Sequence, residues 1–279
     1  MILPRLITAI IGIPLVLSSI WFGGIPYLIL IMAIVVYGIK EYQYIVQKAN
    51  YDVQIVTSYI FGILMLFSVY LNGTKIGNAL VNQGTALLIN IMLIVVFLYE
   101  IIRCYHPKSS PKGATGRIGV TLAGVFFISW TLGHLLLIRD IRPYGCNYTY
   151  YLFLLIWSAD TFAYAFGSRF GKNRLSEKVS YKKTVEGTIA GLMGGIISGI
   201  VLKIILSLKE ISFSEVIFLS LGIVVIDSIS DLAESLLKRD AGLKDTDMLL
   251  PGHGGILDRF DSFLFSAPIF YYYLTIFHR

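Results

Sequence analysis

The chain has 279 residues, of which 56% are hydrophobic and 14% are charged, and its formal net charge is +6. Its mean hydropathy is +0.74. A soluble domain usually carries about a quarter charged residues, so this composition excludes an ordinary soluble protein. The apolar residues form long runs, without alternation, near the length that crosses a bilayer. Because hydrocarbon leaves no partner for unpaired backbone groups, such runs predict helices and not barrel strands.

Nine candidate spans follow one another along the chain. They cover residues 6–22, 26–40, 55–71, 80–102, 117–138, 150–168, 187–206, 214–235 and 260–277. The first follows Arg5 as in a signal peptide, but no small-x-small cleavage site comes after it, so we expect it to be retained. The predicted fold class is an all-α, polytopic transmembrane helical bundle of about nine spans.

The positions of Lys and Arg predict the orientation of these spans. Most of the 23 basic residues lie before the first span or in loops on its side of the membrane. Basic loops stay in the cytoplasm, so we expect a cytoplasmic N-terminus and a multi-pass protein of the cell (inner) membrane. This bias, together with attraction to anionic headgroups, accounts for the net charge, and no nucleic-acid partner is expected.

Polar groups divide the chain into two regions. Residues 1–150 read as N-terminal transmembrane helices with brief connections, while residues 151–279 hold nearly every acidic group in or beside a span, together with two polar cytoplasmic loops. Acidic residues inside spans are unfavourable and usually mark a functional site. We therefore expect any chemistry to lie in residues 151–279.

One helix face in the segment IDSISDLAESLLKRD collects acidic residues. At about 100° per residue, Asp227, Asp231, Glu234 and Lys238 fall on one narrow stripe. Three carboxylates on one stripe repel one another unless a cation or a water-filled cavity lies beside them. The alternative is that they lie in the headgroup region, neutralised by Lys238 and Arg239.

The following cytoplasmic segment, RDAGLKDTDMLLPGHGGILDRFD, interleaves aspartates with Lys and Arg around a glycine-rich turn. Carboxylate oxygens suit Mg²⁺, basic side chains neutralise phosphate oxygens, and glycines let backbone N–H groups approach an anion. The combination predicts a site that holds a divalent metal together with a polyphosphate.

The second polar loop follows Asp160, another acid inside a span. Tyr164, Gly167 and Gly171 lie at helical spacing after it, and the glycines predict close helix packing. SYKKTVEG, residues 180–187, then offers hydroxyls and positive charge suited to a triphosphate or a lipid phosphate. The alternative is an interfacial segment whose Ser and Thr cap the next helix.

Together these two loops closely resemble those of the phosphatidate cytidylyltransferase (CDP-diacylglycerol synthase) family. That family's signature has S-x-x-K-R, then K-D four residues later, then P-x-H-G-G-x-x-D-R-x-D. The matching residues are Ser235, Lys238, Arg239, Lys244, Asp245, Pro251, His253, Gly254, Gly255, Asp258, Arg259 and Asp261. The family's D-T-x-A-Y and S-P-K-K-T-x-E-G patterns are matched by Asp160, Thr161, Tyr164, Ser180, Lys182, Lys183, Thr184, Glu186 and Gly187.

Four positions depart from the family pattern. The family usually has proline at Tyr181, a small residue at Asp247, and glycine at Phe162 and Ser230. None of these departures removes a charged group, so the resemblance still implies an active enzyme.

The resemblance implies a Mg-dependent nucleotidyltransferase of phospholipid biosynthesis, which makes CDP-diacylglycerol and pyrophosphate from CTP and phosphatidate at the cytoplasmic side. It is compatible with a monovalent cation such as K⁺ and with a homodimer. The implied metal ligands are Asp231 and Asp258 at the α-phosphate, with Asp227, Asp160 and Asp261 as further candidates. The implied catalytic residues are Asp231, Asp258, Lys244 and Asp245. The implied substrate-binding residues are Ser180, Lys182, Lys183, Thr184, Lys238, Arg239, His253, Gly254, Gly255 and Arg259.

Two other functions are compatible with parts of the pattern. A CTP-dependent lipid kinase acting on a polyprenol-type alcohol would use the same phosphate-binding residues and release CDP. A cation-coupled transporter would use Asp160, Asp227 and Asp231 as an ion path. Transport does not require the P-x-H-G-G-x-x-D-R-x-D segment, and no inverted repeat is visible in the sequence.

Overall fold

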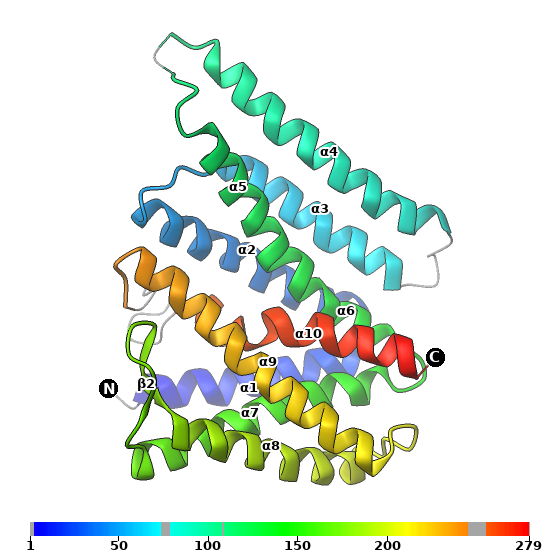
Figure 1. Ribbon diagram of the computed structural model, residues 1–279. Helices are drawn as coiled ribbons and strands as arrows, with labels where there is room; N and C mark the ends of the chain where they lie inside the picture. Colours follow the sequence, from blue (N-terminus) through cyan, green and yellow to red (C-terminus); the bar gives the residue numbers. More distant parts are fainter. Residues whose placement is uncertain (1–2, 74–78, 108, 245–254, 279) are drawn as a thin grey trace.

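The structure is a computed structural model that describes residues 3–73, 79–107, 109–244 and 255–278. Nine helical rods, one of them composite, make up most of this described part (Figure 1). The first four are α1 (Leu3–Phe22), α2 (Gly24–Lys48), α3 (Ile55–Gly73) and α4 (Ala79–Cys104). The fifth is a continuous rod of α5 (Ala114–Gly124), the π-helix η1 (Val125–Trp130) and α6 (Thr131–Asp140). The last four are α7 (Gly145–Phe170), α8 (Val185–Ile205), α9 (Phe213–Asp240) and α10 (Leu257–Phe277).

Each rod contains most of one predicted span, so the helical bundle predicted from hydropathy is confirmed. Two short strands add to it. β1 (Arg174–Ser176) and β2 (Ser180–Thr184) pair antiparallel as a hairpin between α7 and α8. The all-α fold class is therefore confirmed, and the hairpin is a local addition that the sequence analysis did not predict.

Length and apolarity qualify five of the described helices as candidate membrane spans: Gly24–Lys48, Gly84–Cys104, Ala114–Asp140, Val185–Ile205 and Phe213–Asp240. Shorter apolar helices cover Ile10–Phe22 and Ile55–Leu71. α7 and α10 do not meet the same criteria. They carry Asp160, Asp258 and Asp261, which lower their hydropathy.

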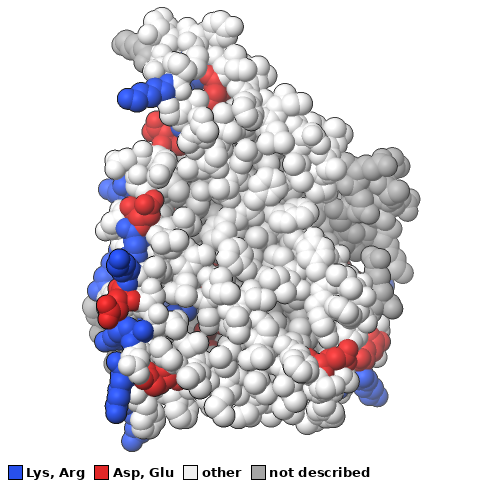
Figure 2. Space-filling view, viewed as in Figure 1, with Lys and Arg blue, Asp and Glu red and all other residues white. Residues whose placement is uncertain are grey.

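The charged side chains gather at the ends of the bundle. On the face in Figure 2, Lys, Arg, Asp and Glu form a band along the left edge and a smaller group at the lower right, and uncharged side chains fill the area between them. The left edge is the end where the β hairpin lies and where α9 ends (Figure 1). This distribution is the one expected of a bundle with an apolar middle in a bilayer.

Glycines allow α7 and α8 to pack closely beside this end. A Cβ atom on Gly167 would lie 3.2 Å from the Cα atom of Gly187, and a Cβ atom on Gly191 would lie 3.1 Å from the Cβ atom of Ala163. The close approach predicted from the glycine spacing in α7 is therefore confirmed.

Local side chains set the starts of α8 and α9. The Thr184 hydroxyl accepts a hydrogen bond from the Gly187 N–H at 3.1 Å. Ser212 and Glu215 form a reciprocal capping box at the start of α9. These caps satisfy N–H groups that have no partner inside their own helix.

Two apolar cores hold the bundle together. The larger packs residues of α2, α6, α7, α9 and α10 around buried aromatic side chains such as Tyr151, Phe263 and Phe270. The smaller joins α3, α4 and η1 through residues such as Met65 and Met92. The helices that carry the acidic residues are therefore packed on helices from the first half of the chain.

Candidate active site at the charged end of the bundle

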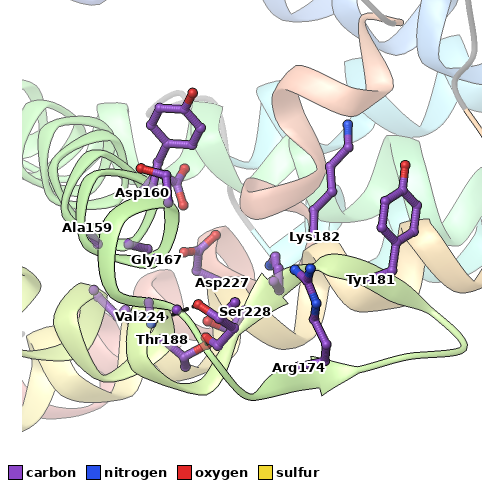
Figure 3. A pocket seen from close by; sticks show the side chains of 18 residues that line it. Ala159, Asp160, Gly167, Arg174, Tyr181, Lys182, Thr188, Val224, Asp227 and Ser228 are labelled. Atoms are coloured by element: carbon purple, nitrogen blue, oxygen red, sulfur yellow. Dashed lines mark hydrogen bonds between the residues drawn. The ribbon is translucent and has the colours of Figure 1, made fainter.

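A pocket of about 550 Å³ opens where α7, α8, α9 and the hairpin meet. Its lining includes Asp160 of α7, Asp227 of α9, and Lys182 and Lys183 of β2. In Figure 3, Asp160 and Asp227 point toward each other, and Arg174 and Lys182 extend from the strands at the other side. The pocket thus combines carboxylates and cations from four separate elements.

Two of the aspartates predicted as metal ligands, Asp160 and Asp227, line this pocket, and Asp231 and Asp261 lie near them. Asp160 interacts electrostatically with Lys183 and Asp231, and Asp227 interacts with Asp160 and Asp261. The Lys183 Nζ atom lies 2.5 Å from Asp231 Oδ2. The acidic stripe of α9 therefore faces polar neighbours from α7, α10 and β2.

Asp258 lies in a second, more buried charge cluster beside the pocket. Lys238 Nζ lies 2.6 Å from Asp258 Oδ1 and 2.5 Å from Glu234 Oε2. The Gly255 N–H donates to Asp258 Oδ2 at 2.9 Å. Both Asp258 oxygens therefore already have partners, and one Lys neutralises two carboxylates. Removing this lysine would leave two poorly solvated acidic side chains without their cation, so the three groups depend on one another.

The basic residues beside the hairpin surround Tyr181. The Arg239 guanidinium lies 5.9 Å and the Lys244 Nζ 5.6 Å from the centre of its ring, within cation–π range. The hydrogen bond from Lys244 lowers the pKa of the Tyr181 hydroxyl below its usual value. Arg239 Nε also donates to the Val179 carbonyl at 3.1 Å. These contacts tie the end of α9 to the hairpin.

The remaining predicted residues fall into three groups. Thr184 lines the pocket, but its hydroxyl caps α8, as the alternative interpretation of this loop anticipated. Ser180 lies on β2 and Arg259 is exposed on the first turn of α10. Asp245, His253 and Gly254, with the departure Asp247, lie outside the described residues.

Besides Tyr181, two more of the departures from the family pattern have partners in the structure. The Ser230 hydroxyl of α9 donates to the Asp261 carbonyl of α10 and accepts from the Phe265 N–H at 3.3 Å. Phe162 of α7 packs against Gly194 of α8, where no side chain stands in its way. Ser230 therefore connects α9 with α10, and Phe162 fills a glycine gap.

Sequence reasoning missed two charged groups near these clusters. Arg174 of β1 lines the pocket, but in the sequence it resembles any other basic loop residue. Glu41 of α2 is buried against the start of α10. In the sequence Glu41 follows Lys40 at the end of a predicted span, which is typical of a charged pair that faces the headgroups. Nothing in the sequence therefore indicated that Glu41 contacts α10.

The chemistry of the donor set fits a hard divalent cation. Mg²⁺ usually takes one or two protein carboxylates and completes its shell with water and substrate phosphates. Asp160 and Asp227 supply such a pair in one pocket. Among the described residues, no three His, Cys, Asp or Glu side chains are placed to hold a metal ion by themselves. A metal bound to this pair would complete its shell with water and substrate oxygens.

This chain is similar in sequence to a protein family and to several known proteins. A model described as "Cytidylyltransferase family" matches residues 3–277. The chain is 29% identical over 301 residues to "Phosphatidate cytidylyltransferase" of Synechocystis sp., covering 98% of this chain and 96% of that protein. It is 33% identical over 158 residues to the protein of the same name from Bacillus subtilis, covering 57% of this chain and 58% of that protein. A Staphylococcus aureus protein of that name is 34% identical over 134 residues, covering 47% of this chain and 50% of its own length.

Proposed function

The chain belongs to the cytidylyltransferase family, and from this premise we propose that it makes CDP-diacylglycerol and pyrophosphate from CTP and phosphatidate. The relatives named "Phosphatidate cytidylyltransferase" support this choice of substrates. The observation that carries the proposal is the pocket itself, because it places carboxylates and lysines together at the charged end of an apolar bundle. We assign the chemistry to residues 151–279.

In the proposed reaction, a phosphate oxygen of phosphatidate attacks the α-phosphorus of CTP. A new P–O bond forms there, the bond between the α- and β-phosphates breaks, and pyrophosphate leaves with the bonding electrons. Phosphatidate is already ionised near neutral pH, so no side chain has to remove a proton from it. The protein's main tasks are then to orient two anions and to neutralise their repulsion.

The cations of the pocket would supply that neutralisation. Lys182, Lys183 and Arg174 line one wall and are positioned to contact phosphate oxygens. Lys183 can exchange its partner Asp231 for a phosphate oxygen. Their ion pair is partly exposed, and such a pair contributes little stability, so it can separate when a phosphate arrives. Arg239, Lys244 and Arg259 extend the positive charge beyond the pocket, and Lys238 holds Asp258 beside it.

The lipid would enter from the side of α8. Tyr164 lines the pocket and is 79% exposed, and Ile189 and Met193 present apolar side chains on the outer face of α8. A lipid phosphate in the pocket could therefore keep its acyl chains against apolar helix surface. This arrangement suits a substrate that never leaves the bilayer.

Mg²⁺, when bound, would neutralise the CTP phosphates and favour departure of pyrophosphate. The residues proposed to hold it are Asp160 and Asp227, which line the pocket, and Asp231, which pairs with Lys183 of its wall, with Asp261 beside them. Asp258 is a weaker candidate than its place in the sequence pattern predicts, because both its oxygens already accept hydrogen bonds. K⁺ as a second cation is part of the proposal, to be tested by activity in K⁺ against Na⁺.

The proposed topology has nine spans, with the N-terminus and the pocket on the cytoplasmic side of the cell membrane. α1 begins at the end of the bundle where the hairpin lies (Figure 1), and that end carries most of the charge in Figure 2. Basic ends of membrane proteins face the cytoplasm. Labelling of single cysteines from either side of sealed vesicles tests this orientation, and light scattering of the detergent-solubilised protein tests the proposed homodimer.

Labelled CTP separates the proposed reaction from its main alternative. Purified protein in detergent is given Mg²⁺, CTP labelled at the α- or the γ-phosphate, and a mixture of phosphatidate and a polyprenol-type alcohol. A cytidylyltransferase moves the α label into the lipid and releases the γ label as pyrophosphate, whereas a lipid kinase moves the γ label into lipid. Label from the γ-phosphate in the lipid would overturn the proposal.

A pair of matched variants links the reaction to the pocket. Asp227→Asn removes a pocket carboxylate while keeping the side-chain volume, and should lower turnover by at least about a hundredfold. Asp52→Asn makes the same change at a residue that is 80% exposed in the loop after α2, and should be silent. Full turnover in Asp227→Asn would remove this residue from the proposed machinery.

A further inference from the structure

Glu41 connects the first half of the chain to the start of α10. Its side chain is fully buried, at 0% exposure, near the end of α2. Oε1 accepts the Ile256 N–H at 2.8 Å and Oε2 accepts the Leu257 N–H at 2.6 Å. These N–H groups lie at the start of α10, where a helix has no internal partners for them. A carboxylate at this place also complements the positive end of the helix dipole.

This cap differs from those of the two preceding helices. α8 and α9 begin at their own residues, Thr184 and Ser212. The N-cap residue of α10, Ile256, makes no side-chain capping hydrogen bond. The N–H groups at the start of α10 are instead accepted by Glu41 of α2, more than 200 residues earlier in the chain. A local cap only starts a helix, whereas a remote cap also fixes where that start lies relative to another helix.

The segment that Glu41 holds leads directly to Asp258. Gly255 N–H and Lys238 Nζ each bind one oxygen of that aspartate. Glu41 itself lies within electrostatic range of Asp258 and Lys238. The start of α10 is therefore held from two sides, by α2 through Glu41 and by α9 through Lys238. Loss of either support would leave Asp258 less well placed.

We propose that Glu41 is a positioning residue of the active site, which fixes the first turn of α10 and through it Asp258 and Lys238. The inference rests on the proposed function, since it assumes that Asp258 and Lys238 serve the transfer reaction. It gives the N-terminal helices a role in catalysis that no charged motif of residues 1–150 indicates.

The test uses Glu41→Gln in the full-length protein. Glutamine keeps the size but points an N–H₂ group at one of the two backbone N–H donors. Because a charge-assisted hydrogen bond is lost and a donor is left unpaired, kcat should fall at least about tenfold, while the KM for phosphatidate stays within about twofold. Amide exchange of residues 255–260, followed by mass spectrometry, should accelerate at least about tenfold.

Glu100→Gln is the matched control. Glu100 is equally hidden in the first half of the chain, at 4% exposure, but it pairs with Arg117 and not with α10. This variant should lower thermal stability and leave both kcat per folded molecule and the exchange of residues 255–260 unchanged. If both variants lower kcat alike, Glu41 has only a general structural role and the proposal is wrong.

Glu41→Asp covers the case in which the glutamine variant does not fold. It keeps the charge but shortens the reach, so exchange and kcat should lie between those of the wild type and the glutamine variant. Wild-type exchange and kcat in Glu41→Asp and Glu41→Gln would overturn the proposal. Wild-type protein that forms no CDP-diacylglycerol would instead overturn the proposed function, while the exchange measurement would still report on the cap.

Discussion

Replacing Lys238 with Met should destabilise the protein far more than replacing Lys183 with Met, although each removes one ion-paired lysine. The difference is burial. The side chain of Lys238 is 10% exposed and its partners Glu234 and Asp258 are 0% and 16% exposed. Lys183 and its partner Asp231 are 28% and 31% exposed. Water can solvate the carboxylate that loses Lys183, but it cannot reach Glu234.

The magnitudes follow from this contrast. Breaking a buried ion pair by removing one partner lowers the free energy of unfolding by about 3–5 kcal/mol, because a buried charge is left uncompensated. A partly exposed pair contributes about 1 kcal/mol or less. At roughly 2–4 °C per kcal/mol for chains of this size class, Lys238→Met should lower the Tm by roughly 10 °C and Lys183→Met by a few degrees at most.

Thermal unfolding in detergent, followed by tryptophan fluorescence, measures both losses on one scale. A double variant supplies the control: Glu234→Gln added to Lys238→Met should recover part of the Tm, because one of the two stranded carboxylates becomes neutral. Equal losses in the two lysine variants would show that burial does not decide their contributions. No recovery in the double variant would show that Glu234 is not the stranded charge.

Two further variants test contacts made by departures from the family pattern. Ser230→Ala removes the hydroxyl that donates to the buried Asp261 carbonyl and should lower the free energy of unfolding by about 1–3 kcal/mol, as measured by thermal unfolding. Tyr181→Leu should raise the KM for CTP severalfold, since Arg239 and Lys244 lose the ring they lie against, whereas Tyr181→Phe, which keeps the ring and loses only the hydroxyl that Lys244 contacts, should raise it less.

The sequence was informative wherever a local pattern decides the structure. Unbroken apolar runs predicted the rods, and the spacing of Asp227 and Asp231 predicted a stripe that does face a pocket. Glycine spacing predicted the close contact of α7 and α8. Each of these features depends on residues within a few helical turns of one another, so periodicity alone reveals it.

Contacts between distant segments were beyond such reasoning. α2 continues to Lys48, past the predicted end of its span, because a helix does not have to end where its apolar run ends. Glu41 lies on that extension, and its partners are in another helix. The hairpin was also missed, since its five-residue strand β2 carries too few alternating positions to be distinguished from a loop.

The contact of Phe162 was also beyond prediction from local sequence, because it depends on Gly194 in the next helix, α8. A Cβ atom on Gly194 would collide with the Cβ and Cγ atoms of Phe162, which lie at the root of that side chain and cannot swing aside as a flexible tip can. Gly194→Ala should therefore destabilise the α7–α8 contact by about 1–3 kcal/mol, as for other overpacked sites. Phe162→Gly would remove the obstacle, so the double variant should lose less stability in thermal unfolding than the sum of the two single losses. If the two losses simply add, Phe162 and Gly194 are not paired, and the compensation inferred for this departure is wrong.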